Sequence, residues 1–232
     1  MQTHHLYLQS IDREGAGSDP ANCRITLGKS LKPQCIALSY AFIPATWYNI
    51  TSRNNQFAVP PTTYTVPPGC YTLADIMQAI ADLLVAHNVT VVFDDTPNRM
   101  TISTTNPFIN IDFSVANSIG RTLGFQNVLY SDEQSYTSSF VPKLYSNSIF
   151  ISINGINSGC ITSQNKNIQN STFIVPANVN KNEICQFYKH SQFNLQPRVR
   201  DTINFFDIRF FDEDGFQLIN LADWSLMLEL IY

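Results

Sequence analysis

The chain has 232 residues, of which 44% are hydrophobic and 12% aromatic but only 14% charged, with a formal net charge of −4. This length suits one large all-β domain or two small ones, and it allows a core without metals or disulfides. The scattered basic residues exclude the clustered cations that a nucleic-acid partner requires, and no apolar stretch approaches the ~20 residues of a membrane span.

Alternation of apolar and polar residues predicts β-strands at both ends of the chain. In the segment 34–44, Ile36, Leu38, Tyr40 and Phe42 are expected to share one strand face. Comparable strand patterns occur at 4–11, 23–28, 148–154, 184–193, 203–211 and 224–232. In the last of these, Trp224, Leu226, Leu228, Leu230 and Tyr232 fall on one face, so the chain end is expected to be core.

The middle of the chain carries a different set of signals. Prolines at 49–68 predict loops and edge strands. One amphipathic helix is expected at about 72–86, where Thr72 and Asp75 have the spacing of a capping box. Its apolar stripe consists of Leu73, Ile76, Met77, Ile80 and Leu84, and we expect this stripe to pack against a sheet.

Beyond the helix, the segments 89–93 and 99–103 predict a β-hairpin, and 108–113 predicts a further strand. A single helical turn closed by Gly124 follows, and a loop-rich insertion is expected at about 126–182. With about eight to ten strands, one helix and no alternating βα pattern, the fold class is an all-β sandwich or barrel. No linker separates two domains, so we expect a single domain over 1–232.

No catalytic, cofactor-binding or metal-binding residues are predicted. His4 and His5 are adjacent and would point to opposite strand faces, while His87 and His190 stand alone. The carboxylate groups at 94–95 and 212–214 lie in expected turns, where Asp commonly bonds the local backbone. We interpret "FFDEDGFQL" as a three-residue hairpin loop with a bulge at Gly215 and with solvated acidic side chains.

The five cysteines are odd in number and widely spaced, without a CxxC motif. They are interpreted as buried, reduced thiols rather than as a zinc site or a disulfide framework; their positions are Cys23, Cys35, Cys70, Cys160 and Cys185. The N-terminal segment "MQTHHLYLQSIDREGAG" has no secretion signal. Together these features favour a protein that is assembled inside a cell.

Three segments carry a resemblance to a known family: "IALSYAFIPATWYNITSRNNQF", "VPPGCYTLADIMQAIADLLV" with "VVFDDTPNRMTIS" and "RTLGF", and "IRFFDEDGFQLINLADWSLMLELIY". In their order and spacing they resemble the single jelly-roll penton and minor capsid proteins of tailless double-stranded DNA viruses. These viruses are the virophages, polinton-like viruses, adintoviruses and their large relatives. The resemblance covers most of the chain except 126–182.

The resemblance implies a single jelly-roll β-sandwich that forms the penton, a homopentamer at the fivefold vertices of an icosahedral virion. It implies other copies of the chain, the major capsid protein and other minor capsid proteins as partners, with no enzymatic activity, cofactor or nucleic acid. Independently of the resemblance, the low content of charged residues and the abundant side-chain amides are typical of a protein with extensive interfaces that retain water. Loops near 49–68 and 155–182 are expected at the ends of the capsomer.

Two alternatives stay open. The chain could be another minor capsid or cement protein, or a jelly-roll carbohydrate-binding module for host attachment. In the second case Trp47 and Tyr48 are candidates to stack on a sugar ring, although a packed strand-end role is favoured for Trp47.

Overall fold

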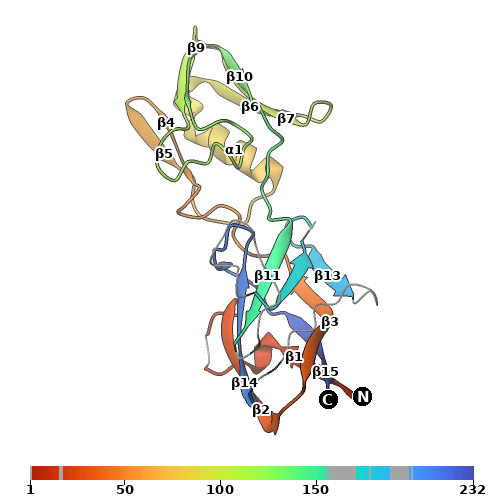
Figure 1. The fold of residues 1–232 in the computed structure, drawn as a ribbon. Helices are drawn as coiled ribbons and strands as arrows, with labels where there is room; N and C mark the ends of the chain where they lie inside the picture. Colours follow the sequence, from red (N-terminus) through yellow and green to blue (C-terminus); the bar gives the residue numbers. More distant parts are fainter. Residues whose placement is uncertain are drawn as a thin grey trace. The chain divides into compact units, whose positions relative to one another are not determined.

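The computed structural model describes residues 2–15, 18–154, 156, 171–177, 179–188, 199 and 201–232. Contacts divide the chain into two compact units (Figure 1). Unit 1 comprises Met1–Trp47 and Tyr145–Tyr232, and unit 2 comprises Tyr48–Leu144.

Unit 1 is a sandwich of two four-stranded antiparallel sheets. Its described strands are β1 (Thr3–Gln9), β2 (Asn22–Leu31), β3 (Cys35–Pro44), β11 (Ser148–Ile153), β12 (Phe173–Pro176), β13 (Ile184–Tyr188), β14 (Ile203–Phe211) and β15 (Ser225–Ile231). The sheet orders are β1-β15-β3-β13 and β12-β11-β14-β2. Counted in chain order within the unit, these orders read 1-8-3-6 and 5-4-7-2, which is the jelly-roll arrangement.

The two sheets enclose one apolar core, because alternate residues of each strand turn inward. From β15, Leu226, Leu228 and Leu230 enter this core, and Trp224 precedes them with only 2% of its surface exposed. Tyr232 is half-buried and packs against the same core. The expectation that the chain end is core is confirmed.

The N-terminal strand completes a sheet. β1 pairs along its whole length with β15, from Thr3 opposite Ile231 to Gln9 opposite Ser225. β15 also pairs with β3 on its other side, so the closing strand is a central strand. The two chain ends therefore lie side by side, and the backbone N–H of Tyr232 donates to the carbonyl of Gln2 at 3.0 Å (Figure 1).

One side-chain prediction for β3 is wrong. Ile36 and Leu38 are buried as expected, but Tyr40 and Phe42 turn to the outer face, and Ala41 and Ile43 enter the core instead. The pairing register with β15 shifts between Met227 and Leu228, where β3 contains one extra residue. Such a β-bulge exchanges the two faces of every following residue.

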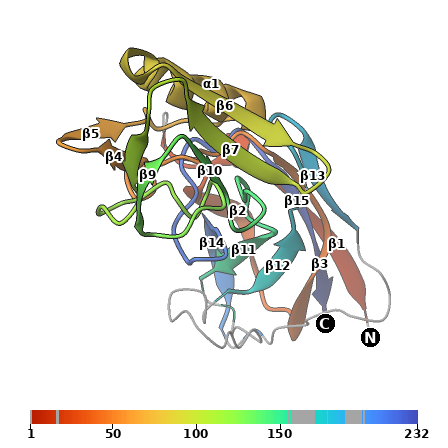
Figure 2. The same cartoon turned by 90° about the horizontal axis from the view of Figure 1, so that it is seen from above.

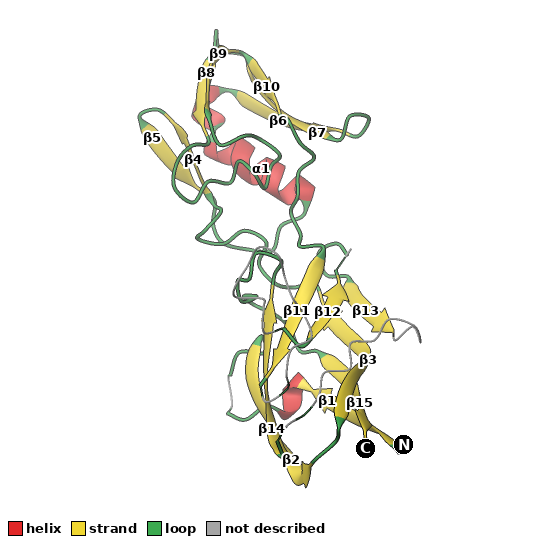
Figure 3. Cartoon of the chain, in the orientation of Figure 1, coloured by secondary structure: helices red, strands yellow, loops and turns green. Residues whose placement is uncertain are grey.

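Unit 2 contains the only α-helix among the described residues, shown in red in Figure 3. α1 (Leu73–Leu83) begins at Thr72, whose hydroxyl accepts from the backbone N–H of Asp75 while the Asp75 carboxylate accepts from that of Thr72. Both bonds of the predicted capping box are thus formed. The short 3-10 helix η2 (Val85–His87) follows, and another, η1 (Ser10–Asp12), lies in unit 1.

Two small antiparallel sheets accompany α1, with orders β5-β4-β8-β9 and β10-β7-β6. Their strands are β4 (Gln56–Val59), β5 (Thr62–Thr65), β6 (Val89–Asp94), β7 (Arg99–Thr104), β8 (Ile109–Asp112), β9 (Leu129–Glu133) and β10 (Ser135–Thr137). Figure 2 shows α1 beside β6 and β7. Ile76, Ile80 and Leu84 share a core with Met100 and Ile102, which confirms that the helix packs on a sheet.

The boundaries of the inserted region differ from those expected. The contacts separate 48–144 from the sandwich, whereas the sequence predicts a loop-rich insertion at about 126–182 within one domain. Part of that stretch, β9 and β10, is short strand in unit 2, and 148–153 is the jelly-roll strand β11. Local patterns did not separate the units because strand periodicity is the same whichever sheet a strand joins.

The fold class is nevertheless the expected one. The described chain is mostly antiparallel β-structure with one helix, and unit 1 has the jelly-roll order. The 89–93/99–103 hairpin is confirmed as β6 and β7. The single helical turn before Gly124 is confirmed: the N–H of Leu123 donates to the Ile119 carbonyl at 3.2 Å, and Gly124, with φ of 84°, closes the turn.

Candidate functional site

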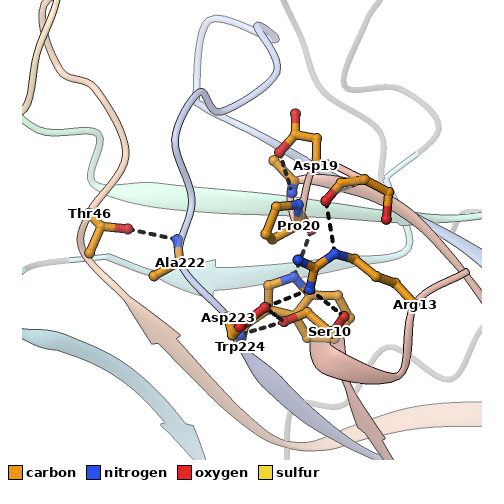
Figure 4. Close-up of polar contacts among 10 residues, drawn as sticks. Ser10, Arg13, Asp19, Pro20, Thr46, Ala222, Asp223 and Trp224 are labelled. Atoms are coloured by element: carbon orange, nitrogen blue, oxygen red, sulfur yellow. Dashed lines mark hydrogen bonds and ion pairs between the residues drawn. The ribbon is translucent and has the colours of Figure 1, made fainter. Parts of the chain in front are cut away.

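A polar cluster joins the start of β15 to the N-terminal segment (Figure 4). Ser10 Oγ donates to Asp223 Oδ1 at 2.8 Å and accepts from the backbone N–H of Trp224 at 2.9 Å. Arg13 Nη1 donates to the same Asp223 oxygen at 2.7 Å and to the Ser10 carbonyl at 2.7 Å. One serine and one arginine thus fix both the side chain of Asp223 and the backbone that follows it.

The charge state of Asp223 follows from these contacts. The hydrogen bond from Ser10, and then the hydrogen bond and charge of Arg13, lower the pKa of the Asp223 carboxyl, although partial burial opposes this. The carboxylate is still 55% exposed, while the Arg13 side chain is 19% exposed. This arrangement is an oriented surface carboxylate rather than a buried acid, which gives no indication of acid–base catalysis.

Trp224 and Thr46 make further hydrogen bonds that hold residues 222–224 in place. The indole Nε1 of Trp224 donates to the carbonyl of Pro20 at 2.8 Å, and its ring lies 4.9 Å from that of Phe210. Thr46 Oγ1 accepts from the backbone N–H of Ala222 at 2.7 Å (Figure 4). The segment 222–224 is therefore a junction of three parts of the chain, whose hydrogen bonds fix its backbone.

The acidic turn at 212–215 is confirmed as a three-residue hairpin loop. The backbone N–H of Asp212 donates to the carbonyl of Phe216 at 2.8 Å, and Gly215 has φ of 80°, a left-handed conformation that favours glycine. The Asp212 carboxylate accepts from the N–H groups of Asp214 and Phe216. Of the three acidic residues only Asp214 is exposed and the other two are half-buried, so the expectation that all three are solvated is only partly met.

The structure separates the other residues that the sequence singled out. His4 and His5 are exposed on β1, and His87 Nε2 lies 3.0 Å from the Tyr64 hydroxyl in unit 2. His190 lies outside the described residues. Within the described part of the chain, no three His, Cys, Asp or Glu side chains are grouped in a way that could hold a metal ion.

The cysteines agree in part with the prediction. Cys23 and Cys185 are buried, and burial raises the pKa of each thiol to about 11, so both stay protonated and unreactive. Cys35 and Cys70 form no disulfide with another described cysteine, and both are only half-buried. Cys160 lies outside the described residues.

The exposed apolar side chains are the main surface feature, and sequence periodicity did not identify them. They occur on both units, and those with the largest exposure are Tyr7, Ile11 and Tyr188 on unit 1 and Val85, Phe108, Leu129, Phe140 and Val141 on unit 2. Trp47, one of two candidates for sugar stacking, is 3% exposed, so its ring is packed and cannot stack on a ligand. No helix in the described ranges is long and apolar enough to span a bilayer.

Comparison with known proteins supports the fold. No protein-family model and no curated protein sequence matches this chain. Among solved structures, the crystal structure of the selenomethionine-labelled mavirus penton protein is similar, with a TM-score of 0.54 and 12% identity. The match covers 100% of this chain and 99% of that chain. It shows that the two chains share a fold, and at the level of fold it confirms the resemblance to penton proteins.

Proposed function

We propose that this chain is a structural capsid protein, the penton that forms pentameric capsomers at the fivefold vertices of an icosahedral virion. The observation that carries the proposal is the extent of the fold likeness, which spans this chain and the mavirus penton protein almost end to end. An isolated jelly roll occurs in many functions. A shared fold over both full lengths supports a shared role more strongly than the sandwich alone.

The surface supports an assembly role independently. Only 14% of residues are charged, and large apolar side chains are exposed on both units. Interface centres are depleted in charge and enriched in aromatic residues. A ring of five copies needs two different complementary surfaces on each chain, because a closed ring uses head-to-tail contacts.

The proposed partners are other copies of the chain, the major capsid protein and other minor capsid proteins, and the proposed location is the virion. This role requires neither catalysis nor a cofactor. We further propose that the loops near 49–68 contact neighbouring capsomers or face solvent at one capsomer end. Most of the second expected loop, 155–182, lies outside the described residues. A cryo-EM map of the virion tests the placement of both.

The oligomeric state tests the main proposal. Native mass spectrometry of the purified full chain is expected to show the mass of five 26.2 kDa chains. A trimer would instead favour another minor capsid, cement or attachment protein. A monomer that stays monomeric in the presence of the major capsid protein would overturn the capsid proposal.

A further inference from the structure

The outer face of the sheet β1-β15-β3-β13 carries two adjacent rows of uncharged side chains. The register places Tyr7, Met227, Tyr40 and Tyr188 directly opposite one another, one from each strand. The next row consists of Gln9, Ser225, Phe42 and Gln186. The β-bulge in β3 is the reason that Tyr40 and Phe42 belong to this face rather than to the core.

The members of these rows that lie on β1, β3 and β15, apart from Met227, form the floor of an open groove of about 430 Å³ within unit 1. Its lining residues are Tyr7, Gln9, Ile11, Tyr40, Phe42, Asp223, Trp224 and Ser225. This volume falls in the range of small-molecule sites, roughly 300–1,000 Å³. The floor is rigid because it is built from three hydrogen-bonded strands, and strands position side chains more accurately than loops do.

The aromatic rings of the groove are held by their neighbours. Gln9 Nε2 donates to the Tyr7 hydroxyl at 3.2 Å, although 53% of the Tyr7 surface remains exposed. The Tyr40 ring lies 5.1 Å from that of Tyr188, tilted by 56°. Exposed tyrosine rings are amphipathic, with an apolar face and a polar tip. They can therefore contact a ligand that is itself apolar on one face and polar at its rim.

Asp223 adds a charged acceptor at the edge of this floor. Ser10 and Arg13 both donate to its Oδ1, and no donor among the described residues bonds its Oδ2. The second oxygen is thus available to accept bonds from a ligand. A carboxylate oxygen accepts well from hydroxyl groups.

We propose that this groove binds a neutral pyranose sugar unit of a glycan. A pyranose ring presents a C–H face that packs on aromatic rings and hydroxyl groups that reach the amide of Gln9, the hydroxyl of Ser225 and the carboxylate of Asp223. The lining of the groove contains no cationic side chain to pair with the anionic group of a sialylated or sulfated sugar. The inference goes beyond the capsid role and does not depend on it, because it rests on the groove of unit 1 alone.

Saturation-transfer NMR tests the proposal on the full chain in its native oligomeric state. The probes are neutral oligosaccharides that end in glucose, galactose, mannose or N-acetylglucosamine, with a sialylated oligosaccharide for comparison. At least one neutral sugar is expected to receive saturation. The substitution Tyr7→Ala should raise the Kd for that sugar at least about tenfold, while Tyr7→Phe, which keeps the ring, should retain binding.

The matched control is Phe108→Ala, which removes an equally exposed aromatic ring from unit 2, 55% exposed against 53% for Tyr7. It should leave the Kd unchanged. The proposal is overturned if no neutral sugar binds at millimolar concentration, or if Tyr7→Ala binds as tightly as the wild type. It is also overturned if Tyr7→Ala disrupts the oligomer without any sugar binding, because the groove would then be a contact between copies.

Discussion

Ser10 connects segments that are 213 residues apart in the chain, through its hydrogen bonds to the side chain of Asp223 and the backbone of Trp224. Nothing in the local sequence marks it, since it lies between a weakly alternating strand and a turn-rich stretch. The segments that carry the resemblance to penton proteins do include Asp223, Trp224 and Ser225. The sequence could not identify their partners, because a hydrogen bond between distant segments leaves no periodic signal.

We expect Ser10→Ala to lower the free energy of unfolding by about 1–3 kcal/mol. The substitution leaves the buried backbone N–H of Trp224 without its acceptor and removes a donor from Asp223. Urea denaturation followed by circular dichroism measures the change. Ser30→Ala is the matched control, because Ser30 is exposed and its hydroxyl bonds only Asn204 at the surface. Equal losses in the two variants would contradict the role given to Ser10.

The hydrogen bonds and ion pair around Asp223 also predict that the stability of the folded protein depends on pH. The folded protein holds the pKa of Asp223 below its ordinary value, through Ser10 first and Arg13 second. This carboxylate therefore contributes stability above the ordinary Asp pKa of about 3.9, and the contribution is lost as the pH falls through the lower folded value. The exposure of the group keeps the effect small.

In the variant Asp223→Asn, the urea concentration at the unfolding midpoint should accordingly decrease less between neutral and strongly acidic pH than it does in the wild type. The wild-type midpoint should fall more steeply as the pH drops from the ordinary Asp pKa of about 3.9 through the lower pKa of the folded state, where the folded carboxylate gains its proton. Asp95→Asn removes the same charge from an exposed turn and separates the effect of the Ser10 and Arg13 contacts from that of net charge. Identical pH profiles for the wild type and Asp223→Asn would refute this account.

At the scale of elements, the spacing of apolar and polar residues predicted the positions of the helix and of most strands. The helix, its capping box, the hairpin β6–β7 and the closing strand all follow from local spacing. The face of Tyr40 and Phe42 did not follow, because one extra residue in β3 reverses the alternation. A bulge is set by the register of the partner strand, so the spacing within β3 alone does not reveal it.

Deletion of residues 225–232 should abolish soluble folding. It removes β15, which pairs with both β1 and β3, together with the buried side chains of Leu226, Leu228, Leu230 and Ile231. At ~1.5–3 kcal/mol for each fully buried side chain, the loss is comparable to the whole stability of a domain, about 5–15 kcal/mol. Expression followed by size-exclusion chromatography measures the outcome.

The control for this deletion is a chain that lacks only Tyr232, which is half-buried and follows β15. It should remain soluble. A soluble and monodisperse chain without 225–232 would show that the closing strand is dispensable, and it would refute the central position of β15 as a stabilising feature.

At the scale of the whole molecule, two separate cores decide how the chain is organised. Ile36, Phe206 and Leu226 belong to the core of unit 1, while Ile76 and Phe113 belong to that of unit 2. A compact region with its own core can fold alone. We therefore expect a fragment of residues 48–144 to fold by itself, as measured by circular dichroism and by cooperative thermal unfolding.

Substitutions in the full chain test in a second way whether the two units unfold independently. Ile80→Ala should lower the stability of unit 2 by about 2–5 kcal/mol, and Leu226→Ala should do the same for unit 1. In scanning calorimetry each should shift a different transition. An unfolded fragment, with a single transition that responds equally to both substitutions, would instead support one domain over 1–232, as the sequence predicts.

By itself, the sequence determined the strand-rich composition, the place of most elements, the buried chain end and the resemblance to jelly-roll penton proteins. Each of these depends on residue types and on spacings within short segments. Only the tertiary structure decided that β1 completes a sheet, that 48–144 has its own core, and that Tyr7, Tyr40 and Asp223 line one groove. Those features depend on pairing between segments that are far apart in the chain, where the strand register and the bulge in β3 set which side chains meet.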